Sequence, residues 1–191
     1  MLSSGFIIKI VLKFAWEKKK DSMMSHPLVD QLRFTRSEFK RALKGLTDEE
    51  AARRFMPMNC IAWNVGHLAW HEQRYFVTFG LGEIPFPELN KLYAYGAPAS
   101  TPNLGEMLAV WKKITKAADP FLDTFTTAKL QEQVVIDGKP LKRYWGNLLQ
   151  RVIYHYWYHT GENSAIRQNL GHTGLPQFVG SIDSQAPYRP E

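Results

Sequence analysis

Two histidines near the C-terminal end of the sequence have the spacing of a metal-binding pair. The segment YHYWYHTGE places His155 and His159 four residues apart, so a helix would carry both imidazoles on one face, one turn apart. Together they can fill two ligand positions of a transition metal. Alternatively, both are structural histidines that bond to backbone or hydroxyl groups in an aromatic core. Spacing alone does not decide between these interpretations.

A third ligand has to come from another helix, and the segment CIAWNVGHLAWHEQRYFVTF offers His67 and His71. His67 shares a helical stripe with Trp63 and Trp70, whereas His71 lies on the adjacent stripe with Tyr75. Both stripes are apolar enough to face a core, so periodicity does not choose between the two histidines.

Three other side chains near these histidines are candidates for chemistry or for structure. Glu162 follows His159 by about one helical turn, and it could orient that imidazole or accept a proton. It could equally pair with a surface arginine. We expect Glu72 to form an ion pair, and Cys60 to be a small apolar filler, since no activating partner is evident.

Helical periodicity and end signals predict four long helices. The expected ranges are 27–44, 60–79 with Asn59 as its N-cap, 104–117 with a continuation past Pro120 left open, and 143–170. Thr47 and Glu50 form a capping-box pattern that predicts a short helical turn, and Asn103 with Glu106 forms a second one.

The connections between these helices differ in length and composition. Residues 80–103 are rich in proline and predict a long structured loop without a regular element. Residues 131–143 give a weak hairpin signal in which Pro140 is confined to an edge. The last twenty residues lack periodicity and should wrap over the helices as a tail. The fold class is therefore all-α, a four-helix bundle.

Composition narrows the classes of protein further. The 191 residues carry a net charge of +6, but the charges are dispersed, so we expect no nucleic-acid partner. Cys60 is the only cysteine, which excludes an internal disulfide and fits a cytoplasmic location. Lys9 and Lys13 interrupt the apolar N-terminal run, and this argues against a membrane anchor or a targeting signal. We expect residues 1–22 to be an extension, with the domain spanning 23–191.

Two longer segments carry a resemblance to a known family. NCIAWNVGHLAWHEQRY and RVIYHYWYHTGENSAIRQNLG, followed by LPQFVG and APYRPE, resemble the DinB-like superfamily of metal-binding four-helix bundles. Thiol-dependent S-transferases and maleylpyruvate isomerase-like proteins are related to it. The resemblance covers about residues 25–191 and implies that His67, His155 and His159 bind the metal, which leaves His71 as the less expected ligand.

The resemblance also implies an activity. Three imidazoles leave a coordination position open, as in catalytic zinc sites. We therefore expect one divalent transition metal, zinc or nickel with iron also compatible, and thiol S-transferase-type chemistry on a small-molecule substrate with a low-molecular-weight thiol. Glu162 is the candidate catalytic residue. The alternatives are a metal-dependent hydrolase and a non-catalytic, stress-associated metal-binding protein. Relatives commonly form homodimers, and we expect the same here.

Overall fold

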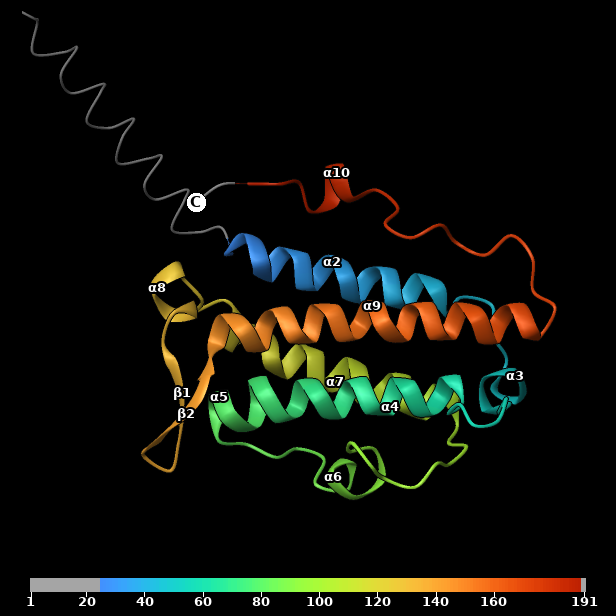
Figure 1. Cartoon of the computed structure of the whole chain (residues 1–191), viewed down its shortest axis with the longest axis horizontal. Coiled ribbons are helices and arrows are strands. Elements are labelled where there is room, and N and C mark those ends of the chain that lie inside the picture. Colours follow the sequence, from blue (N-terminus) through green and yellow to red (C-terminus); the bar gives the residue numbers. More distant parts are fainter. Residues whose placement is uncertain (1–24, 190–191) are drawn as a thin grey trace, which may run out of the picture.

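Four long helices make up about half of residues 25–189, the part of the chain that the computed structural model describes (Figure 1). They form the all-α bundle that the periodicity predicted. Their bounds are α2 Pro27–Ala42, α4 Ile61–Glu72 with its continuations η1 Gln73–Thr78 and α5 Phe79–Leu81, α7 Leu104–Leu122, and α9 Trp145–Asn169.

Short elements occupy the connections between the long helices. The predicted hairpin is confirmed as an antiparallel pair, and its turn residues Asp137 and Gly138 both have positive φ, 50° and 73°. The expectation of no regular element in residues 80–103 was wrong for one turn, α6. The bounds are α3 Asp48–Ala52, α6 Leu89–Leu92, α8 Thr127–Leu130, β1 Gln133–Ile136, β2 Lys139–Tyr144 and α10 Ile182–Gln185.

The helix ends follow the predicted signals with two corrections. Cys60, not Asn59, caps α4, because its Sγ accepts a hydrogen bond from the Trp63 backbone N–H. Only half of the second capping box is present: Asn103 Oδ1 accepts from the Glu106 backbone N–H. The Thr47 capping box is complete, and α7 continues through Pro120 to its end at Leu122.

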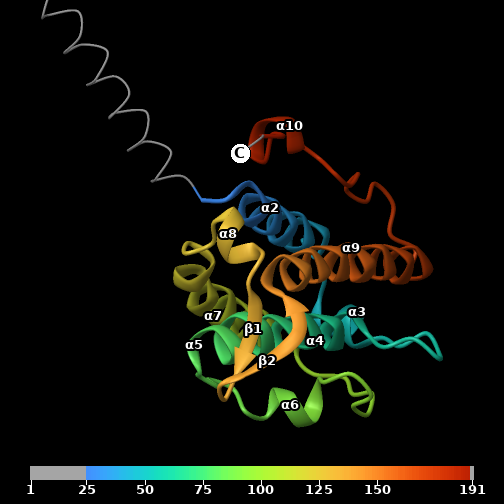
Figure 2. The ribbon, with the colours of Figure 1, turned by 60° about the vertical axis from the view of Figure 1, so that its left-hand side comes forward.

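The helices are arranged so that α2 packs on α9 and α4 packs on α7 (Figures 1 and 2). The colour gradient in Figure 1 shows that α4 and α7 run in the same direction, which requires the long crossover through α6. The tail after α9 returns along α2, where Gln31 Nε2 donates to the Ala186 carbonyl and the Gly180 N–H donates to Glu38. The tail therefore covers α2, as expected.

Two expectations concern the ends of the chain and the membrane. The predicted extension, residues 1–22, and its boundary with the domain lie outside the described residues. Within residues 25–189, no helix combines the length and apolar character that crossing a bilayer requires.

A buried network centred on one ion pair links all four long helices. The Arg36 guanidinium of α2 donates to both carboxylate oxygens of Glu72 on α4, and its Nη1 donates to Asp119 of α7 at 2.7 Å. Tyr156 of α9 donates its hydroxyl proton to Glu72 at 2.6 Å and accepts from Trp111 Nε1 of α7. Glu72 and Tyr156 are fully buried. The sequence-based expectation that Glu72 forms an ion pair is confirmed.

The charges in this network stabilise one another. Burial opposes the charged form of Arg36, but the ion pair and hydrogen bonds with Glu72 outweigh it and raise the guanidinium pKa above its usual value. Burial, reinforced by the adjacent Glu72 carboxylate, raises the pKa of Tyr156, so the phenol keeps its proton. Removing the Glu72 carboxylate would leave buried Arg36 with Asp119 as its remaining ionic partner and would leave the Tyr156 hydroxyl without its acceptor.

We expect Glu72→Gln to lower the free energy of unfolding by about 3 kcal/mol or more, because it leaves the Arg36 charge buried against a neutral amide. Tyr156→Phe should cost about 1–2 kcal/mol through its lost hydrogen bond. The control is Asp123→Asn, which breaks the more exposed pair with Arg33 and should cost less than about 1 kcal/mol. Urea unfolding measures all three, and equal losses for Glu72→Gln and Asp123→Asn would contradict the assignment.

Candidate metal centre

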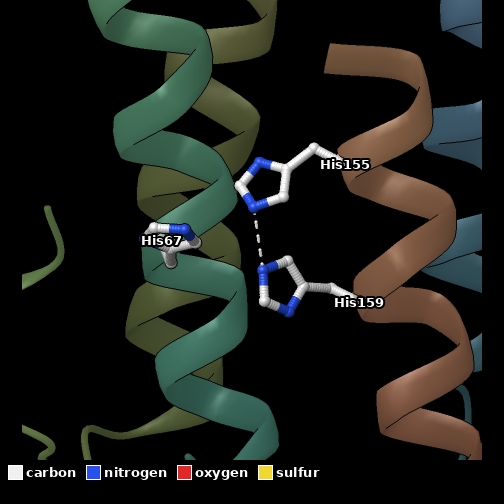
Figure 3. Close-up of side chains that lie close together, drawn as sticks. All are labelled: His67, His155 and His159. Atoms are coloured by element: carbon white, nitrogen blue, oxygen red, sulfur yellow. Dashed lines mark hydrogen bonds between the residues drawn. The ribbon is translucent and has the colours of Figure 1, made fainter. Parts of the chain in front are cut away.

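The bundle brings together the three histidines that the family resemblance indicated. His67 comes from α4, and His155 and His159 lie one turn apart on α9, facing it (Figure 3). Each offers a ring nitrogen, and these three atoms lie within 4.8 Å of one another. His67 and His159 are buried and His155 is partly buried. The group could therefore hold a metal ion.

Each of these imidazoles has its other ring nitrogen in contact with a protein group. His67 Nδ1 lies 2.6 Å from the Tyr93 carbonyl oxygen, and His159 Nδ1 lies 2.7 Å from Glu162 Oε2. Since both partners only accept, these Nδ1 atoms carry the proton, and Nε2 keeps its lone pair. His155 Nδ1 lies 2.7 Å from His71 Nδ1. Such partners orient metal-binding imidazoles and raise their basicity.

The long crossover loop sets the position of His67. Gly66 allows the contact between the Tyr93 carbonyl and His67, because a Cβ at position 66 would lie 2.7 Å from the Tyr93 ring. Gln73 holds the loop through two hydrogen bonds with the Phe86 backbone, at 2.9 and 3.0 Å. Trp70 Nε1 donates to Asn90 at 3.0 Å. The glycine of the GHLAW segment thus lets the loop approach closely enough for its carbonyl to reach His67.

Burial keeps the imidazoles of His67, His71 and His155 neutral at physiological pH. It lowers the pKa of His67 to about 4, although the bond to Tyr93 acts in the opposite direction. Burial, followed by the electrostatic repulsion that a protonated His71 would exert, lowers the pKa of His155 to about 2. His71 itself has a pKa lowered by burial and by His67 to about 3. A neutral imidazole is the form that binds a metal.

The donor set fits a divalent transition metal. The Nε2 atoms of His155 and His159 lie 2.9 Å apart, close to the separation of about 3.3 Å that two nitrogens have in a tetrahedral zinc site with bonds of about 2.0–2.1 Å. Two Nε2 lone pairs at this distance repel unless a proton or a cation lies between them. All-imidazole sites suit zinc, nickel and iron, so the identity of the metal stays open.

Glu162 lies behind His159 rather than in the open part of the site. Its Oε2 accepts from Asn64 Nδ2 at 2.9 Å as well as from His159, and it does not line the adjoining cavity. Asn64 also donates to Asn163. Of the sequence-based alternatives for Glu162, these contacts favour the orienting role over the surface ion pair and over the proton acceptor.

A cavity of about 1040 Å³ opens beside the histidines, and its lining includes His67, His71 and His155. Sequence reasoning considered His71 only as an alternative third ligand, whereas in the structure it contacts His155 and lies outside the three-histidine group. Its signal in the sequence was the i,i+4 spacing from His67, but that spacing could not distinguish a ligand from the partner of a ligand.

We expect the purified protein to carry about one transition-metal ion per chain. His155→Ala with His159→Ala, and His67→Ala alone, should remove it. His71→Ala should keep the ion with about 10–100-fold weaker affinity, because it removes only the partner of His155. Elemental analysis after dialysis measures this. Full occupancy in the double variant would refute the site, and equal retention in His67→Ala and His71→Ala would place the third ligand elsewhere.

We also expect the metal-free protein to lose stability on acidification. The unfolded imidazoles titrate near 6.5, whereas folded His67 and His71 titrate near 4 and 3, so between these values the unfolded chain binds more protons. The stabilisation is complete above about pH 6.5 and is lost as the pH falls. Going from pH 7 to 5 should cost about 1–2 kcal/mol through His71. Thermal unfolding of His71→Gln should show a smaller loss of stability between pH 7 and 5 than the wild-type protein. An equal loss in the two proteins would contradict the lowered pKa of His71.

Comparison with known proteins identifies the family of the chain. A family model of the DinB superfamily matches residues 31–163, a range that contains His67, His155, His159 and Glu162. No curated protein matches the sequence. The family match covers more than half of the chain and confirms the resemblance found in the two histidine-bearing segments, and the chain therefore belongs to the DinB superfamily.

Proposed function

We propose that the protein is a metal-dependent enzyme of the thiol S-transferase type, acting on a small electrophilic substrate. The observation that carries the proposal is the position of His67 and His155, which belong to the three-histidine group and also line a cavity of about 1040 Å³. A cavity of about this size accommodates a small molecule. Two of the three potential ligand residues therefore line a space that substrates can enter.

In this proposal, His67, His155 and His159 hold one divalent metal, with zinc and nickel preferred and iron compatible. A bound metal supplies a Lewis acid that lowers the pKa of a thiol or water in its open position. The chain contributes the orientation of the imidazoles. Glu162 fixes the tautomer of His159, Tyr93 fixes that of His67, and neither residue needs to exchange a proton with substrate.

The cavity supports an enzyme over a non-catalytic metal-binding or stress-associated protein. A structural site would be closed by a fourth protein ligand, whereas the group of potential ligands in residues 25–189 consists of the three histidines alone. The C-terminal tail, which packs along α2, does not contribute to the lining of this cavity. A hydrolase would use the same centre with water in place of a thiol, so thiol binding separates these two activities.

We include in the proposal a cytoplasmic location and a homodimer. Cys60 is buried as a free thiol, and burial raises its pKa above the usual value, which agrees with a structural role in a reducing compartment. Exposed apolar side chains outside the cavity, at Leu81, Ile84 and Leu92, provide apolar surface of the kind found in subunit contacts.

We expect cysteine and glutathione to raise the melting temperature of the metal-loaded protein more than that of the chelator-treated protein. A ligand that binds only the folded, loaded state adds about 2.7 kcal/mol at one hundred times its Kd. The shift should grow from about pH 6 to 8, because coordination favours the thiolate and a free thiol titrates near 8.5. S-methylcysteine, which has the same carboxylate but a sulfur that cannot ionise, is the matched control and should give equal shifts with and without metal.

Two outcomes would contradict this activity. Equal thiol-induced shifts with and without metal would mean that the sulfur of the thiol does not contact the metal. The absence of a shift for every thiol would favour the hydrolase or the non-catalytic protein, even if the metal content is as expected.

A further inference from the structure

The cavity beside the histidines has an unusual charge distribution. Its lining includes four cationic side chains from three elements, Arg74 of η1, Lys142 and Arg143 of β2, and Arg151 of α9, and it includes no aspartate or glutamate. Within residues 25–189, none of these four forms an ion pair with a carboxylate. All four residues are exposed, so solvent and not a paired carboxylate screens their charge.

These cations contrast with the arginines of α2. Arg33, Arg36 and Arg41 each pair with a carboxylate. Like charges around one hollow repel each other, and a low-dielectric wall focuses their field into the cavity. An anion that enters the cavity would relieve this repulsion.

Arg74 is also held in position. Its guanidinium carbon lies 5.5 Å from the ring centre of Trp70, 5.9 Å from that of Tyr75 and 5.7 Å from that of Phe79. Such contacts restrict a long side chain that would otherwise lose entropy on binding a ligand. A pre-positioned guanidinium is suited to a planar carboxylate or to a phosphate.

The helical spacing relates the cations to the histidines. Asn147, Arg151 and His155 lie at i,i+4 intervals on α9, so they form one stripe that leads from the hairpin end of the helix to the three-histidine group. Arg151 is one turn from His155, about 6 Å along the axis. A ligand that reaches from the histidines to this cation therefore needs only the length of a small molecule.

We propose that this cavity binds a small molecule bearing a carboxylate or phosphate, with its anionic group toward Arg74, Arg151 and the hairpin cations, and its reacting end toward His67 and His155. The inference rests on the proposed function in taking this cavity as the substrate site. Exposed phenols at Tyr154 and Tyr158, 66% and 71% accessible, border the cavity and can contact the apolar body of the ligand.

The test uses benzoate and its neutral analogue benzamide, titrated into chelator-treated protein and followed by NMR at low ionic strength, where exposed charges are least screened. Benzoate should bind at least about fivefold more tightly than benzamide. The double variant Arg74→Gln, Arg151→Gln should bring this ratio close to one. The matched control Lys112→Gln, Lys116→Gln removes two exposed charges of α7 outside the cavity and should leave the ratio unchanged. Phenyl phosphate, compared with phenol, distinguishes phosphate from carboxylate as the preferred group.

Three results would overturn the inference. One is equal affinity for benzoate and benzamide in the wild-type protein. Another is a preference for benzoate that appears only after zinc loading and persists in the arginine variant, because the metal and not the cations would then bind the anion. The third is that a short DNA duplex binds more tightly than benzoate and that the same arginine substitutions abolish this binding. Such a result would identify a nucleic-acid site. Since the main titrations use metal-free protein, they can fail while the thiol experiment succeeds, and the reverse also holds.

Discussion

The buried carboxylate of Glu72 is the constraint on which the rest of the bundle depends. A charge without water must be paired and fully hydrogen-bonded, and Glu72 meets this requirement only when Arg36 of α2 and Tyr156 of α9 both reach it. The rotation of each helix about its axis is thereby restricted. The preceding residues in the sequence are His71 and His155, so fixing Glu72 and Tyr156 toward the network also fixes the two histidines that contact each other at 2.7 Å.

A second constraint comes from the crossover loop, which holds His67. The loop is long because α4 and α7 run in the same direction, and its return along the bundle brings the Tyr93 carbonyl over the histidine. Gly66 removes the side chain that would block this approach. The site is therefore built by a helix pair, a loop and a buried network together, although the candidate ligands themselves come from only two helices. Such support is what holds imidazoles in a fixed orientation for a metal.

The sequence was sufficient for the four long helices, the hairpin and the pair His155 and His159, because each rests on local spacing or turn chemistry. Periodicity could not choose between His67 and His71, and the structure shows why: every residue of α4 is buried, so no polar face marks its orientation. The choice came from the family resemblance. The partners of Glu72 and the role of Gly66 depend on contacts between residues distant in sequence. The single turns α6 and α8 were also missed, since four residues are too few to establish a period.

The central claim is that three imidazoles and no other protein side chain bind the metal. Zinc K-edge X-ray absorption of the zinc-loaded protein, recorded without added thiol, tests this most directly, because imidazole rings give multiple-scattering features that can be counted. The account predicts a nitrogen and oxygen shell at about 2.0–2.1 Å with three imidazoles, and the same count in His71→Ala. A shell that contains sulfur, or a count of one imidazole, would contradict the claim. So would the loss of an imidazole in His71→Ala with none lost in His67→Ala.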